Sequence, residues 1–278
     1  MKLSLILPTI ERPKQLDIFL KSVIKSENGF AEIEIIIIDQ STSLAVKQIC
    51  LLNKESPNYK IIYIKSNVLG LSVNRNIGLQ ISTGDIIGFP DDDCSYYSDT
   101  LDYLADFFLN PANAAYDGLI GQIYDKNNNK PLIKNWPQLN LQVSQFNFYH
   151  LSSSITFFCK KNHLKFNEFL GVGAKFGSCE DVDFIYKMLL EGKNIYYTED
   201  IKVWHPTPDF YNIPLKKVES YASGLGYFII NEMSLIKVVL LISCLLTKGK
   251  QAIFSKEIYC KGYFRFYLKG LIRGLKSN

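Results

Sequence analysis

The 278-residue sequence has no apolar stretch long enough to cross a lipid bilayer. Its longest late apolar run, residues 235–246, contains Lys237 and is far shorter than the roughly 20 residues that a spanning helix needs. The first apolar run, residues 3–7, is too short for a signal peptide and leads into Pro8. We therefore expect neither a secretory leader nor a membrane-spanning helix.

Closely spaced cysteines are also missing. The chain has six cysteines, with no Cys-x-x-Cys pair among them, which argues against a cysteine metal or redox motif. A chain of this length does not need a disulfide framework, so we expect a reducing, cytoplasmic location.

A strong net charge is absent as well. The 31 Lys and Arg against 27 Asp and Glu leave a net charge of +4, too small to indicate a nucleic-acid partner. Hydrophobic residues make up 47% and charged residues 21%, a composition typical of a folded globular chain.

What the sequence does contain is an alternation of apolar runs and helical periods. We expect strands at residues 3–7, 33–38, 61–64, 86–89, 155–159, 195–197 and 202–204. We expect helices near residues 16–24, 44–52, 71–82, 101–108 and 180–191, a loop at 127–137, and a helical tail at 214–275. The first half predicts βαβ units, and hence an α/β fold with a mostly parallel sheet flanked by helices.

Three aspartates follow the expected strand at 86–89. Adjacent carboxylates such as Asp91, Asp92 and Asp93 repel one another unless a cation neutralises them, and Mg²⁺ or Mn²⁺ suits oxygen ligands. Pro8-Thr9 and Asp39 stand at two other strand ends, where ligands of parallel sheets bind. An isolated triplet could instead be a solvated turn or a helix cap, but its place after a buried strand favours a cation site.

Two further features carry candidate chemistry. Glu180 and Asp181 open an expected helix, where carboxylates either interact with the helix dipole or, for Asp181, act as a general base. His205 follows a short strand and is either a packed residue or a metal ligand.

These features stand in a recognisable order. The order is 5–9 (LILPT), 37–41 (IIDQS), 74–78 (NRNIG), 83–89 (TGDIIGF), 91–93 (DDD), 180–181 (ED) and His205. Over residues 1–210 they resemble the family 2 glycosyltransferases of GT-A fold, which build bacterial polysaccharides of the cell envelope. The sequence departs from the family at Ile10-Glu11, where Tyr-Asn often follows the first Thr, and at Gln40, where a second Asp is common. Both departures concern base recognition.

The resemblance implies an inverting, metal-assisted glycosyltransferase. It would transfer sugar from a UDP-, GDP- or dTDP-sugar to a hydroxyl of a glycan or lipid-linked acceptor, aided by Mn²⁺ or Mg²⁺. By this resemblance Asp181 is the base, Asp93 and His205 bind the metal, and the nucleotide-sugar contacts are Pro8, Thr9, Glu11, Asp39, Arg75, Asp91 and Asp92.

The resemblance also divides the chain. We expect a catalytic domain at 1–210, with a nucleotide-sugar half (1–118) and an acceptor half (119–210), and a helical extension at 211–278. In the acceptor half, Trp136 either stacks on a sugar or is buried in the core.

The extension concentrates basic charge. After Ser234 there are nine Lys or Arg and one acid, interleaved with aromatic and aliphatic residues. Such a segment suits peripheral contact with the inner face of the cell membrane; packing on the catalytic domain or forming a homodimer remain alternatives.

Two other function classes are compatible with an α/β fold of this kind. A non-catalytic glycan-binding or scaffold protein can share the fold. A sugar nucleotidyltransferase would carry a glycine-rich loop after the first strand, and residues 9–13 contain no glycine.

Overall fold

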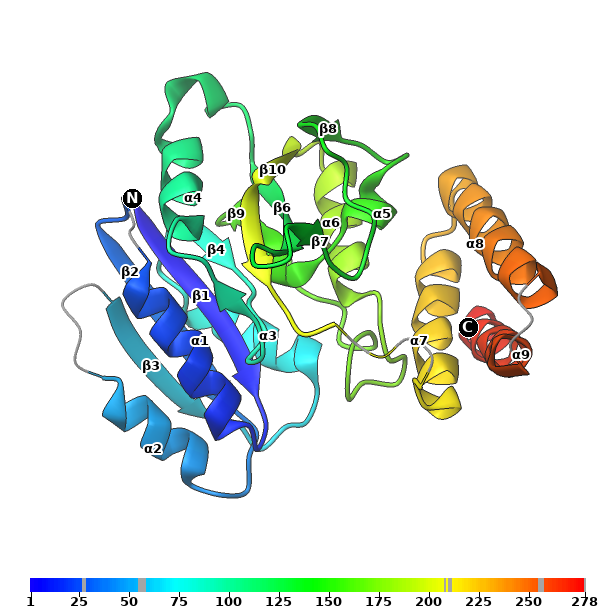
Figure 1. The fold of residues 1–278 in the computed structure, drawn as a ribbon, viewed down its shortest axis with the longest axis horizontal. Helices are drawn as coiled ribbons and strands as arrows, with labels where there is room; N and C mark the ends of the chain where they lie inside the picture. Colours follow the sequence, from blue (N-terminus) through cyan, green and yellow to red (C-terminus); the bar gives the residue numbers. More distant parts are fainter. Residues whose placement is uncertain (27–28, 55–58, 208, 210–211, 255–257, 278) are drawn as a thin grey trace. The chain divides into compact units, whose positions relative to one another are not determined.

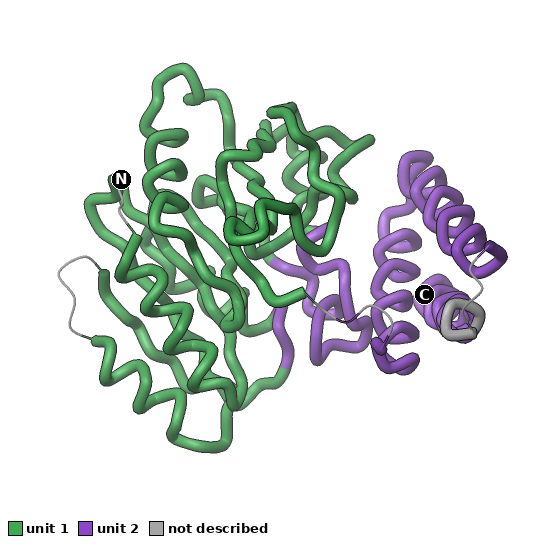
Figure 2. Tube along the Cα trace, viewed as in Figure 1, with its two compact units in different colours: residues 1–69, 73–165, 184–207 green, residues 70–72, 166–183, 208–278 purple. Residues whose placement is uncertain are grey.

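The computed structural model describes residues 1–26, 29–54, 59–207, 209, 212–254 and 258–277, with the backbone alone for 258–261. The chain divides into two compact units (Figure 2). Unit 1 comprises residues 1–69, 73–165 and 184–207, and unit 2 comprises residues 70–72, 166–183 and 208–278. Helix α6 (Glu180–Leu190) therefore begins in unit 2 and ends in unit 1.

Unit 1 is built on one β-sheet, which in the described part of the chain has ten strands. Eight follow the order β3-β2-β1-β4-β9-β6-β10-β5, while β7 pairs with β6 and β8 pairs with β10. The strands are β1 (Lys2–Thr9), β2 (Glu32–Asp39), β3 (Tyr59–Lys65), β4 (Ile86–Gly88), β5 (Ser95–Tyr96), β6 (Gly118–Asp125), β7 (Lys130–Pro131), β8 (Leu141–Val143), β9 (Phe157–Lys160) and β10 (Ile195–Trp204). The first four are parallel to one another, and the predicted α/β fold is confirmed.

The register of the first three strands places polar residues in a row. Thr9 lies opposite Asp39, and Asp39 lies opposite Lys65, all at the carboxyl ends of their strands. β1 and β2 are buried over most of their length, as expected for parallel strands covered on both faces. Pro8 does not end β1 as expected but pairs in register with Ile38.

Helices and short turns connect these strands. They are α1 (Pro13–Lys25), α2 (Ala45–Leu52), α3 (Leu71–Ile81), α4 (Thr100–Leu109), α5 (Phe148–Leu151) and the 3₁₀ turns Pro111–Asn113 and Ser154–Thr156. Figure 1 shows α1 and α2 side by side along β1, β2 and β3. On α3, a Cβ at Gly78 would lie 2.3 Å from Ile6 Cγ2, so the missing side chain lets this helix approach β1 closely.

The second half of the sheet differs from the sequence-based expectation in three places. β6 was not expected, because Gly121 and Gln122 interrupt its apolar run; both are accommodated by β10, where Gln122 donates to the Glu199 carbonyl and a Cβ at Gly121 would meet the Ile201 carbonyl at 2.3 Å. The two short strands expected at 195–197 and 202–204 are one strand, β10, with a register shift between them. The strand expected from residue 155 begins at Phe157, after a 3₁₀ turn.

Unit 2 contains the expected helical tail. Its helices are α7 (Leu215–Ile230), α8 (Leu235–Phe254) and α9 (Ile258–Leu275); residues 255–257 of the expected tail lie outside the described residues. Glycines bring α7 and α9 into backbone contact, since a Cβ at Gly274 would lie 2.2 Å from the Ser223 carbonyl oxygen. Among the described residues, no helix is long and apolar enough to cross a membrane.

Candidate active site

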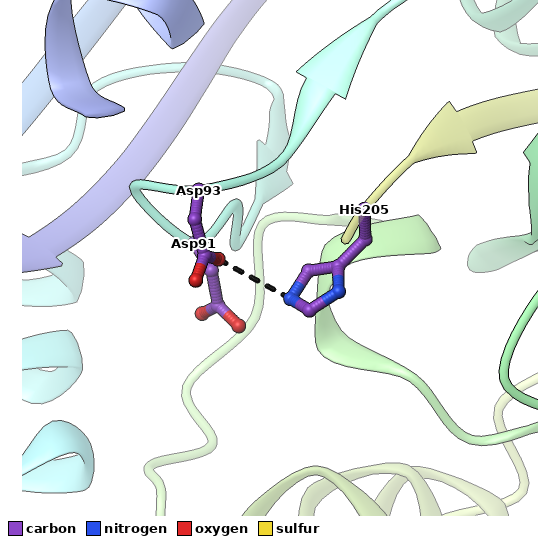
Figure 3. Close-up of side chains that lie close together, drawn as sticks. All are labelled: Asp91, Asp93 and His205. Carbon is purple, nitrogen blue, oxygen red and sulfur yellow. Dashed lines mark ion pairs between the residues drawn. The ribbon is translucent and has the colours of Figure 1, made fainter. Parts of the chain in front are cut away.

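Two aspartates and a histidine from distant parts of the sequence meet in unit 1. Asp91 and Asp93 lie in the turn after β4, and His205 directly follows β10 (Figure 3). β10 runs in the same direction as β4, because β9 between β4 and β6 is antiparallel to both and β6 is parallel to β10. The three residues therefore all lie beyond carboxyl ends of strands.

The donor atoms of these residues fit a divalent cation. One ligand atom from each lies within 4.8 Å of the others, and His205 Nε2 is 3.2 Å from Asp93 Oδ1. Carboxylate oxygens with an imidazole nitrogen are donors that suit Mn²⁺, and the oxygens also suit Mg²⁺. Within the described residues, Asp91, Asp93 and His205 form the cluster whose side chains could hold such an ion.

The imidazole of His205 is oriented by its own backbone. Nδ1 lies 2.7 Å from the Pro206 carbonyl oxygen, so we assign the Nδ1 proton to this hydrogen bond, which leaves Nε2 facing Asp93. Burial lowers the pKa of His205, but the hydrogen bond and negative charge of Asp93 outweigh burial and raise it overall. The same hydrogen bond, with Arg12 nearby, lowers the pKa of Asp93 despite its partial burial.

Asp92 differs from its two neighbours because its side chain is buried. Its carboxylate accepts hydrogen bonds from Thr9 Oγ1 at 2.6 Å and from Arg12 Nη1 at 3.0 Å. Burial raises the pKa of Asp92 more than these partners lower it. The triplet thus divides into two residues that reach the candidate cation site and one that fastens the turn to β1.

Arg12 is a residue that the sequence reasoning missed. Its Nη1 also donates to Asp93 Oδ2 at 2.8 Å, so one guanidinium bridges Asp92 and Asp93. This positive charge offsets the repulsion between the two carboxylates. Its place directly before Pro13, at the turn between β1 and α1, was the available signal.

Arg75 supports the third aspartate. It is fully buried, and its Nη2 donates to Asp91 Oδ1 and to Ser154 Oγ, both at 3.0 Å. The structure therefore places Arg75, predicted from the sequence as a donor contact, beside Asp91 of the same candidate site. Ser154 lies on a 3₁₀ turn far along the chain and carried no sequence signal.

Asp39 is fully buried at the end of β2. Its carboxylate accepts from the Ser41 amide and from the Tyr63 hydroxyl, each at 2.8 Å, and Lys65 Nζ lies 3.8 Å away. Burial and the nearby Asp39 charge raise the pKa of Tyr63. Tyr63 and Lys65 on β3 were also missed; the register of β3 against β2 would have found Lys65.

Glu11 holds a neighbouring loop. Its carboxylate accepts from the amides and hydroxyls of Thr42 and Ser43. These hydrogen bonds, led by the Ser43 hydroxyl, lower the pKa of Glu11 to about 2. Its left-handed backbone (φ 50°) is uncommon outside glycine, so local contacts hold this turn in place.

Asp181 is the second residue of α6 and belongs to unit 2, whereas the other candidates belong to unit 1. It is half-buried, and its Oδ1 accepts from the Val182 amide at 2.8 Å. The preceding Cys179 has φ 69°, an unusual backbone that starts the helix directly before the acidic pair.

Trp136 is buried, as one of its two sequence interpretations expects. Its Nε1 donates to the Leu132 carbonyl, and its ring stacks on Tyr197 with an interplanar angle of 1°. A ring covered in this way is not available to stack on a sugar.

Residues 4–181 match the family described as Glycosyl transferase family 2. The chain belongs to this family. Its predicted Asp-rich turn, acidic helix start and strand ends all lie within the matched residues, whereas His205 and the tail lie beyond them.

Two curated relatives of this family 2 chain act on different acceptors by name. A Campylobacter jejuni protein, GalNAc(5)-diNAcBac-PP-undecaprenol beta-1,3-glucosyltransferase, is 31% identical over 121 residues, which is 43% of this chain and 37% of the relative. Poly(ribitol-phosphate) beta-N-acetylglucosaminyltransferase TarS of Staphylococcus aureus is 28% identical over 107 residues, 38% of this chain and 19% of the relative. The matched segments thus span well under half the length of either relative.

Solved structures share the fold. S. aureus TarS 1–349 in complex with UDP-GlcNAc superposes with a TM-score of 0.64 at 19% identity, over 99% of this chain and 81% of that chain. The mannosyltransferase PcManGT from Pyrobaculum calidifontis, in complex with GDP-Man and Mn²⁺, has a TM-score of 0.59 at 12% identity, over 99% and 87%. At these identities the likeness establishes the GT-A architecture and no more.

Proposed function

We propose that this chain is an inverting glycosyltransferase that transfers a sugar from a nucleotide-diphosphate sugar to a hydroxyl of a glycan or lipid-linked acceptor. The observation that carries the proposal is the convergence of Asp91, Asp93 and His205 within 4.8 Å beyond the strand ends of a family 2 domain. Family relatives named as glucosyl- and N-acetylglucosaminyltransferases support the reaction class.

The donor binds at the strand ends of unit 1. The residues of the nucleotide side are Pro8, Thr9, Glu11, Asp39 and Arg75. Asp91 and Asp92 position the ribose and the sugar. The buried hydrogen bonds of Asp39, Asp92 and Arg75 fix these groups before the donor arrives, which reduces the ordering cost of binding. UDP-, GDP- and dTDP-sugars are the candidate donors; structural neighbours hold UDP-GlcNAc and GDP-Man.

A divalent cation, Mn²⁺ or Mg²⁺, belongs to this site. Asp93 and His205 would hold it, and the geometry adds Asp91 as a third donor. When bound, such an ion supplies positive charge that offsets the charge developing on a leaving diphosphate. Arg12 keeps Asp93 aimed at the site through its 2.8 Å hydrogen bond.

Asp181 removes the acceptor proton. Its carboxylate takes the proton of the acceptor hydroxyl while that oxygen forms a bond to C1 of the donor sugar. The bond from C1 to the diphosphate breaks on the opposite face, and its electron pair leaves with the nucleoside diphosphate. One displacement inverts the anomeric centre, and this general-base step is typically worth about 10²–10⁴-fold in rate.

The proposal also covers the domain organisation and the location of the protein. Residues 1–210 form the catalytic domain and 211–278 a helical extension, in a cytoplasmic protein of polysaccharide biosynthesis. Peripheral membrane contact would bring a lipid-linked acceptor to the site.

Donor binding and transfer can be tested separately. Thermal shift with a panel of UDP-, GDP- and dTDP-sugars, with Mn²⁺ or with chelator, should select one donor and show that its effect needs the metal. Nuclear magnetic resonance of the product, or of the hydrolysed donor, should show an inverted anomeric centre. A retained configuration would reject the single displacement, and no stabilisation by any donor would reject the enzyme proposal.

A further inference from the structure

Helix α8 of unit 2 carries an apolar stripe on its surface. Its members are large aliphatic residues with exposed fractions between 51% and 79%: Leu235, Val239, Ile242, Leu246 and Ile253. At about 100° per residue they fall within a sector of roughly 60° on the helix. Such spacing is the pattern of a helix that buries one face, yet this face is exposed.

The opposite face of α8 makes its contacts within unit 2. Lys237 donates to the Asn231 carbonyl at 2.6 Å and its Nζ lies 4.2 Å from the centre of the Phe228 ring. Lys248 Nζ lies 5.0 Å from the centre of the Tyr263 ring, and Cys244 hydrogen-bonds with Tyr267. These three α8 residues lie about 180° around the helix from the stripe. The stripe is therefore the face of α8 that points away from these contacts with α7 and α9.

The charged residues of α8 are all basic. α8 contains no Asp or Glu, and Lys250 is exposed at the edge of the stripe between Leu246 and Ile253. Elsewhere in unit 2, Arg265 and Lys269 of α9 are exposed, and Lys269 pairs with Glu219 of α7. The acid nearest the stripe along the described chain is Glu232, before the helix begins.

We propose that this α8 surface docks on an anionic lipid surface. The apolar face inserts into the headgroup boundary, while Lys250 at its edge contacts lipid phosphates. A second copy of the chain fits less well, because contact through the stripe would bring together two helices that carry lysines and no acid. The surface shares no residue with the candidate active site, so this proposal stands apart from the proposed catalysis.

The test is co-sedimentation of the full chain with vesicles of phosphatidylcholine mixed with phosphatidylglycerol, compared with phosphatidylcholine alone. The triple variant Val239→Glu, Ile242→Glu, Leu246→Glu should lose at least about tenfold in partitioning to the mixed vesicles. The matched control Leu51→Glu, Leu52→Glu changes apolar residues of α2 with similar exposure and should bind like the unchanged protein. Circular dichroism checks that each variant is folded.

A second variant separates charge from apolar insertion. Lys250→Glu should weaken binding to the anionic vesicles several-fold and leave the weak binding to neutral vesicles unchanged. The proposal is overturned if the unchanged protein does not bind anionic vesicles, or if the triple variant binds them equally well. It is also overturned if light scattering shows that the unchanged protein is a dimer and the triple variant is a monomer that still binds the vesicles.

Discussion

Unit 1 and unit 2 bring chain segments together by different means. In unit 1, buried charged groups such as Asp39, Arg75 and Asp92 are held by hydrogen bonds to neighbouring strands and turns. In unit 2, α7 and α9 meet through glycines, and the surplus surface of α8 is apolar. A network of paired polar groups fixes the directions in which the side chains point, as a binding site for a small charged ligand requires. The glycines of unit 2 set the distance between two helices, which is sufficient for a scaffold or docking element.

The first prediction could break this comparison, since it places the proton transfer in unit 2. Asp181→Asn should lower the transfer rate by about 10²–10⁴-fold and leave donor affinity unchanged, because an amide cannot accept the proton. Transfer kinetics with calorimetry of donor binding measures both. The control is Glu168→Gln, which changes an exposed carboxylate of the same unit. The nearer Asp183 is buried, so changing it could disturb the fold. Wild-type turnover in Asp181→Asn would remove Asp181 as the base.

The second prediction sharpens the role of unit 1 in binding. Asp93→Ala should abolish the metal dependence of donor binding and weaken it about 100-fold, because the cation loses a direct carboxylate ligand. Calorimetry with donor in the presence of Mn²⁺ or of chelator measures the effect. Asp125→Ala, which changes a half-buried carboxylate at the end of β6 and outside the site, should bind donor normally. Equal Mn²⁺ dependence in Asp93→Ala would contradict the metal assignment.

The third prediction concerns the glycine contact of unit 2. Gly274→Ala should lower the melting temperature, because its Cβ would lie 2.2 Å from the Ser223 carbonyl oxygen, at a cost of about 1–3 kcal/mol for overpacking. Gly249→Ala is the control, since its nearest neighbour is a Phe264 ring atom at 3.9 Å. Scanning calorimetry should show the control unchanged or stabilised. Equal melting temperatures of the two variants would show that α7 and α9 are not in this contact.

The fourth prediction tests whether Arg12 supports the donor site. Arg12→Gln removes the charge that bridges Asp92 and Asp93, and donor affinity with Mn²⁺ should fall about tenfold, as for other residues that orient ligands. Lys14→Gln, two residues away and exposed, is the control. An unchanged affinity in Arg12→Gln would assign the bridge to stability alone.

The fifth and smallest effect is a pH dependence of stability in unit 1. Burial alone would raise the pKa of Glu34, but hydrogen bonds from Ser4, Thr83 and Lys2 lower it to about 2, against 4.5 for the free group. Since the folded pKa is depressed, the stabilisation is complete above pH 4.5 and is lost as pH falls toward 2. Glu34→Gln should therefore cost about 1 kcal/mol at neutral pH and little near pH 2.

The control for this experiment is Glu32→Gln, whose carboxylate also contacts Lys2 but is half exposed. Denaturation curves at neutral and acid pH should show a gap between the two variants that closes on acidification. A gap that stays constant with pH would contradict the depressed pKa of Glu34.

Much of unit 1 could be predicted from the sequence because its first half is locally regular. The apolar runs between residues 3 and 89 are strands with polar side chains at or just beyond their ends, so Thr9, Asp39 and Asp91 could be placed near strand ends without coordinates. β6 could not be predicted, since Gly121 and Gln122 are tolerated there only by the facing bulge of β10. The sequence pattern predicted two short strands where the structure has the single strand β10. The register shift that interrupts the pattern depends on the paired strand and is not a local property.

The sequence by itself determined the fold class and the family, because periodicity and short motifs are local. Only the tertiary structure decided what each aspartate of the triplet does. Asp92 turns inward to Thr9 and Arg12, while Asp91 and Asp93 face His205 across more than a hundred residues of chain. It also decided which face of α8 stays exposed, since that depends on where Lys237, Cys244 and Lys248 find partners. Such contacts are fixed by packing between distant segments, and no local pattern encodes them.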